Sequence, residues 1–123
     1  MENERAASKA EVDFGYFQGV DIRVGRVISA PFAVGTRSPS REMTLDFGVL
    51  GLRRSIGQFA LIPEDDLVGH NILAVVNLGP RKIGKYTSEV LVLGVRHPES
   101  PTNQAQALPL TVSDLAVLGS EVF

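Results

Sequence analysis

Basic side chains in three separate segments are the residues of this chain best suited to bind a ligand. Guanidinium and ammonium groups pair with phosphate oxygens, and such contacts give an affinity that does not depend on base sequence and weakens steeply with salt. Each could alternatively be a solvated surface charge, but their grouping favours a binding surface. They are Arg37 and Arg41, Arg53 and Arg54, and Arg81, Lys82 and Lys85.

Catalytic and metal-binding patterns are weak. The two histidines, His70 and His97, have no nucleophile or acid at a telling spacing, and the absence of cysteine excludes disulfides, thiolate metal sites and a cysteine nucleophile. Gly79 and Gly84 lack the Lys-Ser/Thr ending of a phosphate-binding Walker loop. The acids at 64–66 suit the start of a helix better than a metal site. We therefore expect no enzyme, no metal and no cofactor.

Composition points to one folded domain with a mildly basic middle. The chain has 123 residues, 44% of them apolar, and a net charge of −2. Residues 20–96 hold ten basic and seven acidic side chains, whereas both ends are acidic. No apolar run approaches the roughly 20 residues that span a bilayer, and the first residues lack the apolar core of a secretory signal. We expect no membrane insertion and a cytoplasmic location.

Apolar alternation and turn residues predict an all-β domain. Strands are expected at 20–30, 43–47, 52–59, 72–77 and 88–95, with a short helix at 63–69 between the third and fourth strands. Residues 108–110 and 121–123 form terminal extensions, and residues 1–12 form a disordered tail before a domain at 13–123. The arrangement is that of a five-stranded OB-fold barrel. A sandwich fragment or a split barrel are the alternatives from pattern alone.

Several local features follow from the same pattern. Strand 20–30 should place Val24 and Ile28 on its apolar face, with Gly25 available for a bulge. Residues 13–17 should form a helical turn that either plugs one end of the fold or contacts a partner. The glycine-rich segment between strands four and five should be a mobile loop. Oligonucleotide-binding barrels bind on strands two and three between the loops that join strands one and two and strands four and five, where all three basic groups fall.

Four motifs resemble the tRNA-binding domain family in order along residues 14–123: VDIRVGRV at 20–27, TLDFG at 44–48, VVNLGPRKI at 75–83 and SEVLVLG at 88–94. The resemblance implies an OB-fold homodimer without catalytic activity or bound metal. It also implies that Asn77, Arg81 and Lys82 belong to a tRNA-binding loop region. Glu42 stands where relatives often carry lysine, and Gly79 replaces a bulkier or prolyl residue.

Partners other than tRNA are left open by the sequence. The stand-alone members most similar to this chain are export-related chaperones, thought to bind unfolded preproteins in hydrophobic pockets of the dimer. Residues 72–76 and 90–93 are apolar on both faces, so the outer face requires cover from the terminal segments or a second subunit. A scaffold whose acidic tail recruits a protein partner is a third hypothesis.

Overall fold

The structure is a computed structural model that describes residues 7–123. Residues 1–6 of the predicted disordered tail lie outside the described residues. Residues 7–12 are exposed and belong to no helix or strand. The first helix begins at Phe14.

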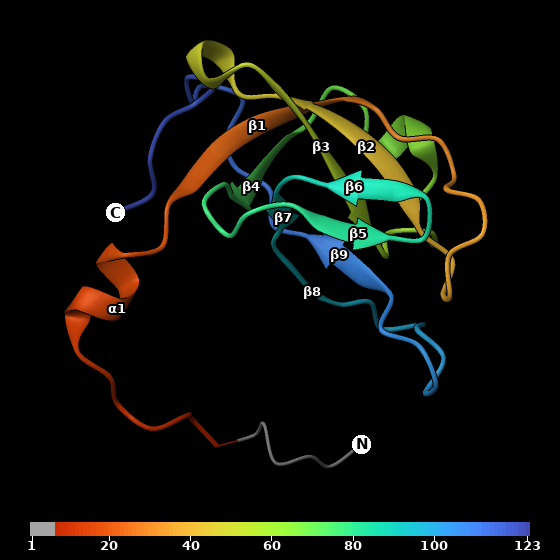
Figure 1. The fold of residues 1–123 in the computed structure, drawn as a ribbon, viewed down its shortest axis with the longest axis horizontal. Helices are drawn as coiled ribbons and strands as arrows, with labels where there is room; N and C mark the ends of the chain where they lie inside the picture. The colour runs from red at the N-terminus through yellow and green to blue at the C-terminus, as the bar shows by residue number, and fades with distance from the viewer. Residues whose placement is uncertain (1–6) are drawn as a thin grey trace.

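An antiparallel five-stranded sheet forms the body of the molecule (Figure 1). Its order is β3-β2-β1-β4-β7, and its two edges approach each other where the backbone N–H groups of Glu89 and Val90 both donate to the Arg54 carbonyl, at 2.8 and 3.3 Å. The sheet is thereby a nearly closed barrel, which confirms the predicted all-β class. The strands are β1 Ile22–Ser29, β2 Arg41–Asp46, β3 Leu52–Gly57, β4 Asn71–Val75 and β7 Leu91–Val92.

Strand β2 lines the core as its alternation predicts. Met43, Leu45 and Phe47 are at most 1% exposed, while Thr44 and Asp46 between them remain partly accessible. Side chains alternate across a strand, so the same pattern turns the intervening residues outward. Because the other side chains of β2 face the core, Thr44 and Asp46 are among the residues that remain available to a ligand.

The predicted apolar face of the first strand is wrong at Val27 and Ile28. Val27 is buried and Ile28 is 46% exposed, the reverse of the expectation. Val27 faces inward because it pairs with Leu45, which is fully buried. A register irregularity follows between Val27 and Ser29, and this extra residue shifts the alternation by one position, so that Ala30 is buried as predicted. Gly25, where a bulge was expected, instead lies against the ring of Phe47.

The fifth predicted strand and the loop before it are both corrected. Residues 88–95 do not form one strand; they are divided among β6 Tyr86–Ser88, β7 and β8 Gly94–Arg96. The Ser88 hydroxyl causes the first break, because it accepts from the Ile56 N–H and donates to the Val90 carbonyl. The expected mobile loop is an ordered hairpin, in which β5 Arg81–Ile83 pairs with β6.

The helix expected at 63–69 is a single 3-10 turn, η3 Glu64–Asp66, followed by turn residues. Pro63 precedes it, and Gly69 has a positive φ of 89°. The Glu64 side chain accepts a hydrogen bond from the Ala30 N–H at 3.0 Å, so this acid ties the turn to the end of β1. A second 3-10 turn, η2 Gly48–Leu50, makes the expected connection between β2 and β3.

The C-terminal extension covers the outer side of β4. The Leu73 N–H donates to the Leu110 carbonyl at 3.1 Å, and β9 Ala107–Pro109 pairs with β8. Farther along, Glu121 forms a bridge with Arg23 of β1. The terminal segments therefore supply part of the cover that the two-faced apolar strands require.

Helix α1 Phe14–Gln18 stands apart from the barrel (Figure 1). None of its residues is buried: Phe14 is 69%, Tyr16 70% and Phe17 40% exposed. The expected pairing of Phe14 with Phe17 is present, with ring centroids 6.0 Å apart, but α1 does not plug this barrel. Among the helices of residues 7–123, none has the length and apolar character needed to cross a membrane.

Candidate nucleic-acid interface

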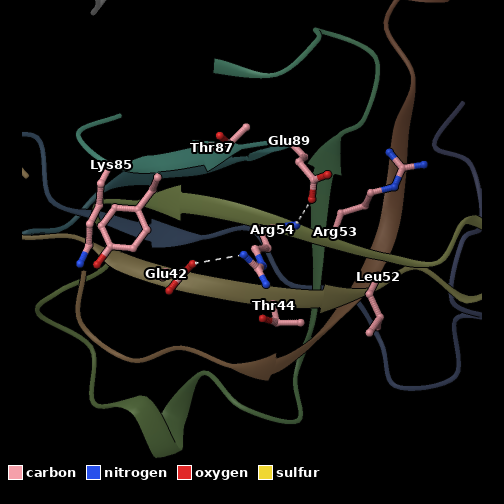
Figure 2. Close-up of a pocket in the computed structure, with 9 residues that line it drawn as sticks. Glu42, Thr44, Leu52, Arg53, Arg54, Lys85, Thr87 and Glu89 are labelled. Carbon is pink, nitrogen blue, oxygen red and sulfur yellow. Dashed lines mark hydrogen bonds and ion pairs between the residues drawn. The ribbon is translucent and has the colours of Figure 1, made fainter. Parts of the chain in front are cut away.

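A cleft of about 540 Å³ lies over the outer surface of β2 and β3, beside the β5–β6 hairpin (Figure 2). Thr44 of β2 and Arg54 of β3 are cross-strand partners, so their side chains share this surface. We call this space the central cleft. It is lined by Glu42, Thr44, Leu52, Arg53, Arg54, Lys85, Tyr86, Thr87 and Glu89.

Arg54 occupies the middle of the central cleft between two carboxylates. Its Nη1 is 3.9 Å from Glu42 Oε2, and its backbone N–H donates to Glu89 Oε1 at 2.8 Å. The Arg54 side chain is 66% exposed and that of Glu42 is 29% exposed. Arg53 points away from Arg54, as expected for neighbours in a strand (Figure 2). Both arginines line the cleft, but only Arg54 lies beside Glu42.

The β5–β6 hairpin forms one wall and is tied to the loop between β1 and β2. Tyr86 Oη accepts a hydrogen bond from the Val34 N–H at 2.8 Å. Lys85 Nζ lies 5.5 Å from the centre of the Tyr86 ring. Gly84 makes the tight turn with a φ of +60°, which glycine tolerates best. The glycines that suggested mobility instead permit the turn.

The remaining hairpin cations lie on the exposed rim. Arg81 and Lys82 are exposed on β5, and Lys82 is the cross-strand partner of the cleft residue Thr87. Arg37 is exposed in the loop between β1 and β2. Within residues 7–123, the side chains of these three cations make no hydrogen bond or ion pair. Arg37, Arg53, Arg81, Lys82 and Lys85 are called the rim cations below.

Arg41, unlike these exposed cations, is buried and bonded to the backbone. It is 3% exposed, and its Nε, Nη1 and Nη2 donate to the carbonyls of Phe59, Ala30 and Ile62 at 3.2, 2.6 and 2.8 Å. Phe32 covers its guanidinium, with the ring centre 4.1 Å from Cζ. Arg41 thus closes one end of the barrel and is left out of the candidate interface. Its alternation with Met43, which lies inside, was the sequence signal for this burial.

Asn77 acts as a backbone anchor. Its Oδ1 accepts from the Asp21 N–H and its Nδ2 donates to the Gly19 carbonyl, each at 2.9 Å. These bonds fasten the end of β4 to the link between α1 and β1. Nearby, Arg23 Nε donates to Asp21 at 2.6 Å, and this hydrogen bond raises the pKa of Arg23 above its ordinary value.

Sequence reasoning did not include the acids and hydroxyls of the central cleft among the site residues. Thr44, Thr87 and Glu89 enter it, and Glu42 was noted only as a departure from the family pattern. Outward alternation on β2 was an available signal for Glu42 and Thr44. No sequence signal pointed to Glu89, because its position depends on the interruption of the strand after β6.

A second cleft, of about 560 Å³, brings His70 near Asp66 and Asp114. Asn71 lines it, but the amide of this buried residue is already bonded to Arg26 Nε and to the Ser113 carbonyl. Within residues 7–123, no cluster of three or more His, Asp or Glu side chains is arranged to hold a metal ion. This cleft has no cationic lining and is separate from the basic groups.

The fold recurs in known proteins. The chaperone CsaA of Bacillus anthracis str. Ames superposes with a TM-score of 0.81 and 32% identity, covering 93% of this chain and 100% of that one. The chain belongs to the tRNA-binding domain family. The CsaA chaperone of Picrophilus torridus also superposes with a TM-score of 0.81, at 28% identity, over 92% of this chain and 100% of that one. No family model matches the chain.

The chain is also similar in sequence to one part of a much larger enzyme. The methionine–tRNA ligase of Bdellovibrio bacteriovorus is 32% identical over 114 residues, which make up 92% of this chain. The chain spans only 16% of that ligase's length. The shared part is therefore a small module of the enzyme, and the ligase reaction is not carried over with it.

Proposed function

We propose that this protein is a non-catalytic tRNA-binding protein with the OB fold, similar to CsaA, that acts as a homodimer in the cytoplasm. The observation that carries the RNA-binding proposal is the set of rim cations. Arg53 and Lys85 line the central cleft, and Arg81 and Lys82 are exposed on the hairpin that forms one of its walls. Arg37 is exposed in the loop that bonds to this hairpin through Tyr86. Cations beside a concave surface suit a folded RNA, whose phosphates can be contacted without reading bases. Strand order and the position of η3 support the OB assignment.

Arg81 and Lys82 give the sharpest test of RNA binding. We expect the double substitution Arg81→Ala, Lys82→Ala to weaken tRNA binding at low salt and to reduce the slope of log affinity against log salt by roughly 2, about one per lost phosphate contact. Filter binding between 50 and 300 mM salt measures both. The matched control is Arg96→Ala, because Arg96 is equally exposed but lies on β8, outside the central cleft.

Absence of tRNA binding at low salt would refute the proposal. So would a double variant that binds with the affinity and salt slope of the unaltered protein. Arg96→Ala removes one charge and the double variant removes two, so a loss of half the size in log affinity would mean that net charge, not the rim, determines binding.

The exposed apolar surface of α1 supports the homodimer. Phe14, Tyr16 and Phe17 are exposed on a helix with no buried residue, although large apolar side chains contribute favourably when removed from water. The adjoining surface is also apolar: Leu78 follows the anchor Asn77, and Phe123 follows Val122, whose N–H donates to the Ile22 carbonyl at 2.9 Å. A second copy of the same patch would cover it in a twofold contact.

Sedimentation analysis tests this interface. We expect Phe14→Ser, Phe17→Ser to shift the protein to monomer at micromolar concentration, while Val49→Ser leaves it unchanged. Val49 is a fair control because it is 97% exposed on η2 and contributes no α1 surface. A double variant that remains dimeric would refute the role of α1.

A chaperone function is the second candidate, favoured by the likeness to the CsaA chaperones. Unfolded preproteins present apolar segments, which would bind in hydrophobic pockets formed by the dimer and not on the α1 surface that the second copy covers. We expect the dimer to suppress aggregation of an unfolded client at stoichiometric ratio, and the monomeric Phe14/Phe17 variant, which lacks those pockets, to suppress it less. The chaperone proposal fails if the unaltered protein protects no client.

A further inference from the structure

The lining of the central cleft mixes cations with carboxylates. Arg53, Arg54 and Lys85 line it together with Glu42 and Glu89, so three positive charges stand against two negative ones (Figure 2). A surface that binds only phosphates would not place two carboxylates among its cations, because carboxylates and phosphates are both negative and repel each other at short range. The cleft therefore suits a neutral group that carries both hydrogen-bond donors and acceptors.

Glu42 is the carboxylate available to such a group. Its nearest cation, Arg54 Nη1 at 3.9 Å, is beyond hydrogen-bond distance. No donor in residues 7–123 bonds to its carboxylate oxygens, whereas Glu89 Oε1 already accepts from the Arg54 N–H. The Glu42 side chain is 29% exposed and held on a strand, which limits its motion. An ionised carboxylate only accepts, so it selects a partner with donors side by side.

We propose that the central cleft binds an unpaired guanine base of the RNA, with Glu42 accepting its N1–H and N2–H groups. The inference rests on the RNA-binding function proposed above. Guanine alone among the four bases presents two adjacent donors next to an acceptor, O6, on its Watson–Crick edge. Adenine and cytosine would turn a ring acceptor toward the carboxylate, and uracil offers one N–H between two carbonyls.

The cation beside Glu42 completes the match. Arg54 lies next to the carboxylate and keeps most of its side chain accessible, so its guanidinium donates to O6 while Glu42 accepts from N1 and N2. The volume of about 540 Å³ falls in the range of small-ligand clefts. Lys85 lines the cleft and Lys82 pairs with the lining residue Thr87, so both are close enough to contact the phosphates of the same nucleotide. Reading unpaired bases by their Watson–Crick edges is the usual source of sequence preference in RNA binding.

A loop-base substitution series tests the proposal. Stem-loop RNAs with A·U stems differ only in one loop position, which holds guanine, inosine or adenine. Inosine keeps N1–H and O6 but lacks the N2 amino group. Fluorescence anisotropy measures their affinity for the unaltered protein, for Glu42→Gln and for Glu99→Gln. Glu99 is an exposed acid in the loop between β8 and β9, so its substitution changes net charge equally without touching the cleft.

We expect the unaltered protein and Glu99→Gln to prefer guanine over adenine roughly tenfold, which is within the range of a good bidentate base contact. The preference over inosine should be smaller, about threefold, because inosine loses only one of the two donors. Glu42→Gln should lose most of this preference while still binding RNA. The salt slope should be the same for all three loops, because the phosphates are unchanged.

Each contrary outcome overturns a defined statement. Equal affinity for all three loops refutes the guanine site and leaves general RNA binding intact. Equal affinity for guanine and inosine refutes the paired contact to Glu42, as does a guanine preference that survives in Glu42→Gln. If no stem-loop and no tRNA binds at low salt, the proposed function fails together with this inference.

Discussion

Substituting Arg41 separates a structural arginine from a ligand-binding one. Arg41 donates three hydrogen bonds to backbone carbonyls at one end of the barrel and is 3% exposed. Arg37 lies four residues earlier, is exposed, and has no side-chain partner among residues 7–123. The pair Arg41→Met and Arg37→Met therefore removes the same charge from two opposite environments.

The expected loss for Arg41→Met is about 3 kcal/mol of unfolding free energy. Each of its three hydrogen bonds contributes roughly 1 kcal/mol net or more because the donor is charged, and the substitution leaves three carbonyls without donors. Removing a buried charge offsets part of this loss, since its desolvation was unfavourable. Arg37→Met should change the unfolding free energy by no more than about 0.5 kcal/mol, as is usual for exposed sites.

Urea unfolding at 25 °C measures the stability of both variants, and tRNA binding under conditions where both are folded measures the other role. A domain of this size has roughly 5–15 kcal/mol of stability, so Arg41→Met should remain folded in the absence of denaturant. We expect it to bind tRNA normally, whereas Arg37→Met loses affinity. A stability loss below about 1 kcal/mol in Arg41→Met, or a larger affinity loss than in Arg37→Met, would refute the structural assignment.

Three further substitutions test local geometry. Gly25→Ala should destabilise the fold by about 1–3 kcal/mol in urea unfolding, because an added Cβ would lie 2.7 Å from the buried Phe47 ring; a neutral effect would contradict this packing. Asn77→Ala should speed amide hydrogen exchange of Asp21, whose N–H loses its acceptor, and unchanged exchange there would count against the anchor. Tyr86→Phe should speed exchange of the Val34 amide while leaving the β5–β6 amides protected.

The barrel could be predicted from sequence because its strands alternate cleanly. Met43, Leu45 and Phe47 needed only the period of two to be placed inside. The prediction failed at Val27, which pairs with the inward-facing Leu45, and after Ser88, whose hydroxyl bonds to the Ile56 N–H and the Val90 carbonyl. Those events depend on the partner strand, which a single strand's pattern does not contain.

The candidate site was predictable only as a region. Sequence could group the cations by segment, but it could not tell which of Arg53 and Arg54 lies beside Glu42, because that depends on which face of β3 is covered. It assigned Arg41 by charge alone, although the alternation with Met43 was visible. Sequence reasoning also left Glu42 out of the site. Its candidacy as a ligand-binding residue depends on its position beside Arg54 and on the lack of a hydrogen-bond donor to its carboxylate within residues 7–123, and neither is visible in the sequence.

The number of cations available to phosphates limits how tightly one barrel can bind RNA. Arg41 is buried and Arg54 lies beside Glu42, so only the rim cations are counted. Five rim cations allow a salt slope of about −4 at most, if each contacts one phosphate of a folded RNA. A twofold dimer presents two such rims, and binding of the second becomes intramolecular once the first is bound. The monomeric Phe14/Phe17 variant should therefore bind tRNA with roughly half the salt slope and at least tenfold more weakly, although its rims are unaltered. A monomer that binds with the full slope would mean that one barrel makes all the phosphate contacts, and that the dimer serves another purpose.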